Sequence, residues 1–258
     1  MPVRFDNKIV LVTGATSGLG RDAAIAFAAA GARVVATGRR QDAGDETLAR
    51  IREQGGTGIF VAADITRARD AERVVAAAVA EYGGLDIAYN VAGISGDAWS
   101  KCGDYDLAAW DETIAANLSS MFYCMRYEIP ELLKRGGGAI VNMSSVAGVD
   151  STPGGVGYVA SKHGIIGLTK AAALDYAANN IRINAVAPAV IYTEMLAAGI
   201  AQQPGLESSM IVKHPIGRFG QLSEVTNAVL WLCSDEASYI TGSTLTVDGG
   251  YTIHAAGG

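Results

Sequence analysis

Residues 9–20 read Ile-Val-Leu-Val-Thr-Gly-Ala-Thr-Ser-Gly-Leu-Gly. The apolar run is typical of a strand buried on both faces, and an Ala-rich stretch with helical spacing follows over 19–30. Glycines let the backbone turn tightly and approach a phosphate, while the helix N-terminus offers free N–H groups and a positive dipole. The turn therefore predicts a dinucleotide site, although a tight strand-to-helix turn uses glycine in any case. Its residues are Gly14, Ser17, Gly18, Leu19 and Gly20.

The rest of the chain repeats this alternation of short apolar runs and longer helical stretches. Such an alternation predicts right-handed crossovers and a parallel sheet with helices on both faces. We expect an α/β, doubly wound, Rossmann-like fold with residues 1–258 as a single dinucleotide-binding and catalytic domain. Ligands of such sheets bind at the carboxyl ends of the strands. The further strands are predicted at 33–37, 58–63, 85–90, 138–143, 181–187 and 243–247, and the helices at 42–54, 67–82, 107–134, 156–178 and 221–234.

Composition excludes several classes of protein. Half of the 258 residues are hydrophobic and 18% are charged, which argues against disorder. The net charge is −6 and no basic cluster is longer than Arg39-Arg40, so we expect no nucleic-acid partner. No apolar stretch reaches the length of a membrane span. The three cysteines are not in C-x-x-C spacing, which favours reduced thiols in a cytoplasmic protein. No metal-binding motif is present.

The end of the second strand bears on the choice of cofactor. An acid at this point would accept a hydrogen bond from a ribose 2′-hydroxyl, whereas an arginine would accommodate a 2′-phosphate. Here the acid is missing and Arg39 and Arg40 follow Gly38. We therefore favour NADP(H) over NAD(H), with the alternative that both arginines only begin a solvated helix. Asp64, followed by Ile65, ends the third strand, and its carboxylate is expected to bind adenine or to cap the next helix.

A group of polar residues lies near the end of the fifth strand. Tyr158 and Lys162 are four residues apart in a helical stretch, so they share one face. Ser144 and Ser145 end the strand, and the Gly- and Ser-rich connection 146–157 suits a loop over a site. Each residue alone has a simpler interpretation: a core tyrosine, a surface lysine, or, for Asn117, a bend in a helix.

Taken together, these motifs identify a resemblance to the classical short-chain dehydrogenase/reductase family. The resemblance extends from about residue 7 to residue 251, and the order and spacing of the motifs are specific. The matching residues are Thr13-Gly14-x-x-x-Gly18-x-Gly20, Asn90-x-Ala92-Gly93, Asn117, Ser145, Tyr158-x-x-x-Lys162, Pro188, Thr193 and Asp248-Gly249-Gly250.

The resemblance implies a role for each catalytic residue. Tyr158 is the acid/base that exchanges a proton with the substrate oxygen. Lys162, with the charge of the oxidised nicotinamide, lowers the pKa of the phenol by about 1–3 units and binds the nicotinamide ribose. Ser145 holds the substrate oxygen in the manner of an oxyanion-hole donor. Asn117 anchors a water that links Lys162 to solvent.

The remaining cofactor residues lie at two other strand ends. Small side chains at Ala92 and Gly93, after Asn90, let the backbone pass close to the adenine ribose. The resemblance implies that Pro188, Ile191 and Thr193 border the nicotinamide. The family usually has Pro-Gly where this chain has Pro188-Ala189, and a positive φ at Ala189 would cost about 1 kcal/mol or more.

Substrate residues are less clearly marked. We expect a lid around 189–214 and a moderately apolar pocket formed by Ser145, Val146, Val156, Met195 and Leu196, with Trp99 near its mouth. The substrate itself stays open. The family resemblance further implies a homotetramer that packs through the helices predicted at 107–134 and 156–178.

The sequence thus predicts an oxidoreductase that transfers a hydride between NADP(H) and a carbonyl or secondary alcohol of a small molecule. An NAD(H)-preferring dehydrogenase and a catalytically silent dinucleotide-binding regulator are the alternatives. A dehydratase or epimerase of the same family usually has a longer C-terminal part. A serine hydrolase would need a G-x-S-x-G elbow, which is absent around Ser144 and Ser145.

Overall fold

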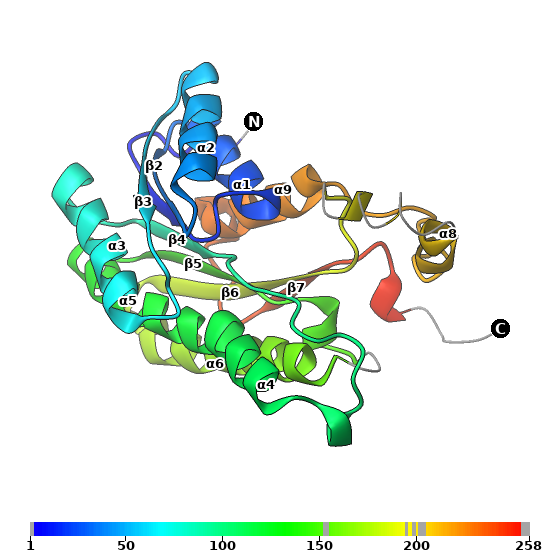
Figure 1. Ribbon diagram of the computed structural model, residues 1–258. Helices are drawn as coiled ribbons and strands as arrows, with labels where there is room; N and C mark the ends of the chain where they lie inside the picture. Colours follow the sequence, from blue (N-terminus) through cyan, green and yellow to red (C-terminus); the bar gives the residue numbers. More distant parts are fainter. Residues whose placement is uncertain (1–2, 152–154, 194–195, 198–199, 201–204, 254–258) are drawn as a thin grey trace.

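The computed structural model describes residues 3–151, 155–193, 196–197, 200 and 205–253. Within this part, seven parallel strands form one sheet in the order β3-β2-β1-β4-β5-β6-β7 (Figure 1). Every strand predicted from the sequence is present, with ends shifted by two residues or fewer. The strands are β1 (Ile9–Val12), β2 (Arg33–Gly38), β3 (Thr57–Ala62), β4 (Ile87–Asn90), β5 (Gly138–Met143), β6 (Ile181–Pro188) and β7 (Thr244–Val247).

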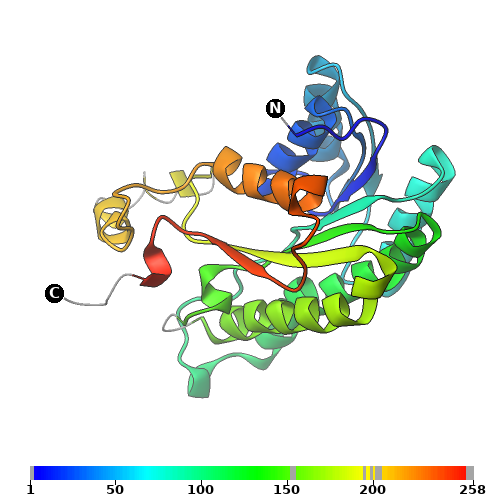
Figure 2. The same cartoon turned by 180° about the vertical axis from the view of Figure 1, so that it is seen from behind.

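Helices cover both faces of the sheet, as the alternating pattern predicts. One face carries α1 (Gly18–Ala29), α2 (Gln41–Glu53) and α9 (Leu222–Cys233). The other carries α3 (Ala68–Tyr82), α4 (Leu107–Ile114), α5 (Ser120–Lys134) and α6 (Val156–Tyr176). The short helix α8 (Leu206–Ile211) stands beyond the carboxyl ends of β6 and β7, away from both layers (Figures 1 and 2).

The core divides into two clusters because successive side chains of a strand point to opposite faces. In β1, Val10 and Val12 pack against α1 and α9, while Ile9 and Leu11 pack against α3 and α5. All four side chains are buried. A central parallel strand therefore needs an unbroken apolar run, which is what this sequence supplies.

Two local expectations differ from the structure. The helical stretch 107–134 is divided by a π-helical segment, Ala115–Ser119, between α4 and α5. Thr66 stands one residue before the helix predicted at 67–82, where it would be the N-cap, but α3 begins at Ala68 and its N-cap residue is Arg67. The hydroxyl and backbone N–H of Thr66 instead donate to the Asp64 carboxylate, at 2.7 and 3.2 Å.

The strand order reverses between β1 and β4, the two strands that meet at the centre of the sheet. At such a point the loops after the two strands separate and leave room for a ligand. Among the described residues, no helix is long and apolar enough to cross a bilayer.

Candidate active site

The turn after β1 touches the segment that continues from β4. Gly14 has φ +65°, and a Cβ added to it would lie 2.9 Å from the Cα of Ala92. The Thr13 hydroxyl accepts from the backbone N–H groups of Val91 and Ala92, at 3.0 and 3.2 Å. Glycine is therefore required at position 14 both for its backbone conformation and for the close approach.

The N-terminus of α1 opens onto a groove. Ser17 is the N-cap residue and is exposed, and the first turn carries no acidic side chain. Ser17, Gly18 and Thr193 line a cavity of about 430 Å³ between α1 and the segment after β6. The first-turn N–H groups of a helix have no partner within it, so this groove fits the pyrophosphate of a dinucleotide. The neighbouring Leu19 is half-buried and packs against the core.

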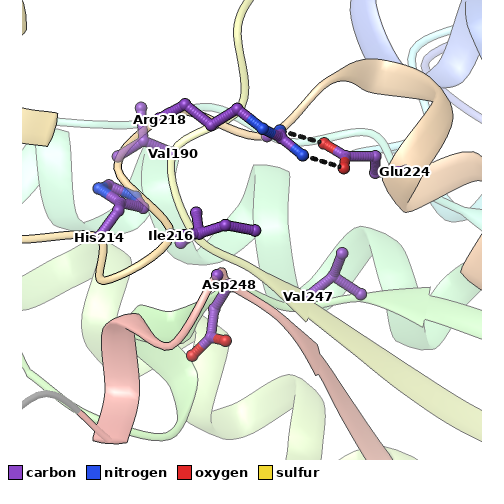
Figure 3. A pocket seen from close by; sticks show the side chains of 10 residues that line it. Val190, His214, Ile216, Arg218, Glu224, Val247 and Asp248 are labelled. Atoms are coloured by element: carbon purple, nitrogen blue, oxygen red, sulfur yellow. Dashed lines mark hydrogen bonds and ion pairs between the residues drawn. The ribbon is translucent and has the colours of Figure 1, made fainter.

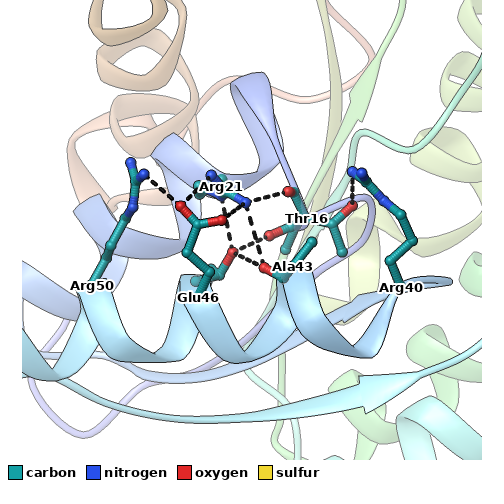
Figure 4. Close-up of polar contacts among 8 residues, drawn as sticks. Thr16, Arg21, Arg40, Ala43, Glu46 and Arg50 are labelled. Atoms are coloured by element: carbon teal, nitrogen blue, oxygen red, sulfur yellow. Dashed lines mark hydrogen bonds and ion pairs between the residues drawn. The ribbon is translucent and has the colours of Figure 1, made fainter.

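A buried arginine that the sequence analysis missed holds this turn in place (Figure 4). Arg21 donates to the backbone carbonyl of Thr16 at 2.6 Å and to both carboxylate oxygens of Glu46 at 3.2 and 3.0 Å. The Thr47 hydroxyl donates to the carbonyl of Ala15 at 2.8 Å. Side chains of Arg21 and Thr47 thus bind the backbone carbonyls of the glycine-rich turn, and they connect this turn to α2.

The two arginines after β2 stand at the start of α2. Arg39 and Arg40 are both exposed, and Arg40 is the N-cap residue of α2. The Arg40 guanidinium lies 3.5 Å from the Thr16 hydroxyl, so it faces the glycine-rich turn (Figure 4). After β3, the half-buried Asp64 accepts from Thr66, and half-buried Ile65 lies beside it. The predicted adenosine end is therefore brought to one edge of the sheet.

The helix α6 places Tyr158 and Lys162 one turn apart. The Lys162 ammonium lies 5.4 Å from the centroid of the Tyr158 ring and donates to the carbonyl of Met143 at 3.0 Å. Ser145 is half-buried at the end of β5, where its Oγ accepts from the N–H of Ala147 at 3.2 Å and its hydroxyl acts on the pKa of the Tyr158 phenol. The predicted serine, tyrosine and lysine are therefore brought together.

Burial is the main influence on the pKa values of Tyr158 and Lys162. Burial raises the pKa of Tyr158, and the hydrogen bond from Ser145 opposes that shift. Burial lowers the pKa of Lys162 to about 8. The family resemblance predicts a lowered pKa for the phenol beside Lys162 and the oxidised nicotinamide, but in the protein alone the direction is opposite, because burial disfavours the phenolate. The phenol accordingly keeps its proton at neutral pH.

Two further serines fix the catalytic helix, and the sequence analysis did not assign them. The buried Ser144 hydroxyl donates to the carbonyl of Lys162 at 2.9 Å. The Ser161 hydroxyl donates to the carbonyl of Tyr158 at 2.7 Å and accepts from Asn117 at 3.1 Å. The sequence marks Ser161 only weakly: it follows Tyr158 by three residues, so the two side chains share one face of the helix.

Asn117 and Asn90 are buried, and both bind backbone or interior groups. Asn117 lies in the π-helical segment, accepts from the N–H of Ile94 at 2.7 Å and donates to its carbonyl at 2.9 Å. It therefore fixes the loop that continues from Ala92 and the exposed Gly93. The Asn90 amide points into the interior, toward Glu128 and Asn142, so only its backbone is left to border a cofactor.

The segment after β6 forms the other wall. Pro188 and Ile191 are buried, Thr193 is half-buried, and the Thr193 hydroxyl accepts from the N–H of Leu196 at 3.2 Å. Ala189 is not among the residues with positive φ, so the anticipated strain at this position does not arise. Leu196 is half-buried, whereas Met195 lies outside the described residues.

On the substrate side, the predicted residues are only partly assembled. Val146 is buried directly after Ser145, and Val156 is half-buried at the start of α6. Trp99 is 90% exposed, so it lines no pocket in this structure.

A second, smaller cavity of about 70 Å³ lies behind Ala189 and Val190 (Figure 3). His214 lines it, donates from Nδ1 to the carbonyl of Met210 at 3.0 Å, and packs edge-on against Phe219. Beside it, Arg218 pairs with both carboxylate oxygens of Glu224, at 2.8 and 2.7 Å. The Arg218–Glu224 pair attaches the segment that follows the predicted lid to α9.

The fold and this site define a nicotinamide-dependent oxidoreductase of the doubly wound class. Residues 14–252 match the model of a protein family described as enoyl-(acyl carrier protein) reductase. By this match and by its similarity to curated relatives, the chain belongs to the classical short-chain dehydrogenase/reductase family. It is an NAD(P)-dependent enzyme that acts on CH–OH and C=O groups of small molecules.

Three relatives illustrate the family. Cyclohexanol dehydrogenase from Acinetobacter sp. (strain SE19) is 42% identical over 252 residues, covering 98% of each chain. The structure of 7α-hydroxysteroid dehydrogenase complexed with NADH and 7-oxo glycochenodeoxycholic acid is 35% identical, with a TM-score of 0.90 over 96% of this chain and 95% of that one. A structure from Agrobacterium tumefaciens with bound NADP is 33% identical, with a TM-score of 0.89 over 98% and 99%.

Proposed function

We propose that this enzyme reduces a carbonyl on a small alicyclic molecule with NADPH, with Tyr158 as the acid, and runs the reverse oxidation when product accumulates. The observation that carries the proposal is the position of Lys162, whose ammonium lies 5.4 Å from the centroid of the Tyr158 ring. The Ser145 hydroxyl acts on the same phenol, since it lowers the pKa of Tyr158 against the effect of burial.

The raised pKa of Tyr158 favours the reductive direction, because the phenol holds the proton that a developing alkoxide takes up. Ser145 donates to the same oxygen and stabilises its charge. Lys162, with its pKa lowered to about 8, keeps a positive charge at neutral pH and stabilises the phenolate left after transfer. Asn117 fixes the loop beside the lysine. Bound NADPH supplies the hydride that the carbonyl carbon receives.

The preference for NADP(H) is supported by charge at the adenosine end. Arg39 and Arg40 are exposed at the start of α2, and no acid ends β2. A ribose 2′-phosphate there would meet one or two guanidinium groups. Gly14, Ser17, Gly18 and Gly20 would hold the pyrophosphate, with Leu19 behind them; Asp64, Ile65, Asn90, Ala92 and Gly93 would border the adenosine; Pro188, Ile191 and Thr193 would border the nicotinamide.

An alicyclic substrate is supported by the walls of the site and by the relatives. Val146 directly follows Ser145, and Val156, at the start of α6, and Leu196, on the predicted lid, would complete an apolar wall. One relative is named for cyclohexanol and another was solved with a 7-oxo steroid acid. Both substrates present an oxygen on a saturated ring, which an apolar pocket with one hydroxyl donor suits.

We further propose a cytoplasmic homotetramer. Five large apolar side chains are exposed on the helices of one face: Leu107 and Trp110 on α4, Phe122 and Leu133 on α5, and Leu174 on α6. Apolar side chains gathered on one face of a protein mark contacts between chains. All three cysteines are free thiols, as in a reducing compartment.

The proposal is tested by following consumption of NADPH and NADH with the purified enzyme. Cyclohexanone and substituted cyclic ketones are compared with linear ketones of equal carbon number, and the alcohols are tested in reverse. We expect turnover with cyclic ketones and a higher kcat/KM with NADPH. Cofactor binding with no turnover on the whole panel would favour the regulatory alternative.

A further inference from the structure

A polar chain crosses the interior between α5 and α6. Glu128, on α5, is fully buried. Its Oε2 accepts from the amide of Asn90 at the end of β4, at 3.0 Å, and the same amide donates to Asn142 on β5 at 3.2 Å. Asn142 in turn donates to the hydroxyl of Thr169 on α6, at 3.0 Å. The chain therefore links two neighbouring strands of the sheet to the two helices that cover them.

If Glu128 is a carboxylate, this row of hydrogen-bonded side chains has too few donors for its acceptors. Asn90 spends both of its amide protons, one on Glu128 and one on Asn142. Within the described part of the chain, Oδ1 of Asn90 and Oε1 of Glu128 are buried and meet no donor. These two acceptors belong to the two partners of one hydrogen-bonded pair. An unsatisfied buried acceptor costs about 1–3 kcal/mol, so two of them side by side need an explanation.

Among the described residues around Glu128, no positive charge compensates its carboxylate. The helix α3, which packs on α5, contributes apolar side chains to the shared core cluster. Strand β5 carries no charged residue, and Asp86, at the far end beside β4, pairs with Arg135. Lys162 is buried against the carbonyl of Met143, and the thiol of Cys124 is buried one turn away on α5 itself. The other charged side chains of α3 and α6 are exposed or paired at the surface: Arg69, Asp70, Glu72, Arg73, Glu81, His163, Lys170 and Asp175.

We propose that Glu128 is a neutral carboxylic acid whose hydroxyl donates to Oδ1 of Asn90, closing a two-bond acid–amide ring that makes it a positioning residue for the dinucleotide site. A single proton on Oε1 of Glu128 forms a hydrogen bond with Oδ1 of Asn90, and neither atom is then without a partner. The burial of the group acts in the same direction, because loss of water raises the pKa of Glu128 to about 8.

The ring matters for the site because Asn90 is joined directly to the segment that supports the glycine-rich turn. Val91 and Ala92 reach the Thr13 hydroxyl through their N–H groups, and Ala92 lies against Gly14. A fixed Asn90 side chain therefore fixes the strand end on which the glycine-rich turn rests. This part of the inference rests on the proposed cofactor site, whereas the protonation state of Glu128 does not.

Protonation has a defined consequence for stability. In the unfolded chain the carboxyl titrates near 4.5, and in the folded protein near 8. Between these values the folded state holds one proton more than the unfolded state. The contribution of Glu128 to stability is therefore fully present below pH 4.5 and is lost as the pH rises through about 8. A glutamine at this position mimics the neutral acid, since its NH2 group can donate to Asn90 and its carbonyl can accept from Asn90, and it does not titrate.

The direct test is carbon NMR of the wild-type protein labelled at the glutamate side-chain carboxyl. Glu128 is the one buried glutamate among the residues that the structure describes, so its resonance is recognised by its shift. We expect one signal to keep the shift of a neutral acid at neutral pH and to disappear in Glu128→Gln. If every glutamate signal has moved to the carboxylate position by pH 6, the proposal is wrong, whatever the variants do.

The second test compares variants. Glu128→Gln should keep wild-type affinity for NADPH and lose the fall in urea midpoint that the wild type shows as the pH rises toward 8. Glu128→Leu, which makes neither bond, should weaken NADPH binding. The control Glu72→Gln removes an exposed carboxylate from α3 and should keep the wild-type pH profile. Equal pH profiles for wild type and Glu128→Gln would overturn the protonation. Unchanged NADPH affinity in Glu128→Leu would overturn the positioning role, and failure of the proposed function would appear instead as absent turnover with the acid signal intact.

Discussion

The two ends of the proposed site differ in their distance from water. At the proton-transfer end, Lys162 is 4% exposed and the pKa values of both Lys162 and Tyr158 are set first by burial. At the adenosine end, Arg39 and Arg40 are exposed at the start of a helix. The same kind of charged group is therefore costly to hold at one end and nearly free at the other.

This difference in exposure determines how strong the electrostatic interactions are at each end of the site. A buried ammonium and a half-buried phenol interact strongly with a reacting oxygen, because little water screens them. Two surface guanidinium groups attract a phosphate, but solvent and salt screen that attraction. Changes at the buried end should therefore be large and pH-dependent, whereas changes at the exposed end should be small and salt-dependent.

The largest effect is expected at the buried phenol. Tyr158→Phe removes the proton donor and keeps the ring, so turnover should fall by about 10²–10⁴-fold while affinity for the dinucleotide stays nearly the same. Steady-state rates and a fluorescence titration with NADPH measure the two quantities. Tyr239→Phe, at a fully exposed tyrosine, is the matched control and should leave both unchanged. A Tyr158→Phe enzyme that retains most of its activity would remove the acid/base assignment.

The pairing of Tyr158 with Lys162 was predictable because it depends on local geometry alone. Two residues four apart in a helix share a face wherever that helix is placed. The seven strands were predictable for a similar reason, since a strand buried on both faces must be apolar along its whole length.

Other parts of the site depend on contacts between segments far apart in the sequence. Arg21 reaches Glu46, 25 residues away, and Asn90 reaches Glu128, 38 residues away. No periodicity marks such pairs, because their partners are chosen by how the helices pack on the sheet. The π-helical segment around Asn117 is also hidden, since the apolar pattern of 107–134 reads as one continuous helix. The raised pKa of Tyr158 follows from burial, which spacing does not reveal.

The second effect concerns the stability cost of the buried ammonium. The pKa of Lys162 falls from 10.5 to about 8 on folding, so between these values the unfolded chain holds more protons. Stability should therefore rise as the pH increases from about 8 to 10.5, by roughly 3 kcal/mol in total. Lys162→Met should lack this rise when urea unfolding is measured across the same window.

Lys170→Met, which removes an exposed lysine of the same helix, controls for the loss of a surface charge. Its unfolding free energy should follow the wild-type pH profile. Parallel profiles for wild type and Lys162→Met would mean that Lys162 is not buried in its charged form, and the contrast between the two ends would then disappear.

A smaller effect is expected at the residue that attaches the adenosine end to the interior. Arg21→Lys keeps the charge but cannot bond at once to the carbonyl of Thr16 and to both oxygens of Glu46. We expect a loss of about 1–2 kcal/mol in unfolding free energy. NADPH and NADH should both bind more weakly, and by similar factors, because the turn that holds their shared pyrophosphate moves. Arg52→Lys, at an exposed arginine of α2 that is not among the residues lining the 430 Å³ cavity, should have little effect on either cofactor.

The smallest effect, and the one that separates the two cofactors, is expected at the exposed arginines. Arg39→Ala should weaken NADPH binding by about 1 kcal/mol, roughly fivefold, and leave NADH binding unchanged, because only NADPH carries the 2′-phosphate. The loss should shrink as salt is added, since both the arginine and the phosphate are open to solvent. Arg52→Ala removes an equally exposed charge from the far end of α2 and should affect neither cofactor. If Arg39→Ala weakens the binding of NADPH and of NADH equally, the guanidinium interacts with a group that both cofactors share. The exposed end of the site would then not discriminate between the two cofactors.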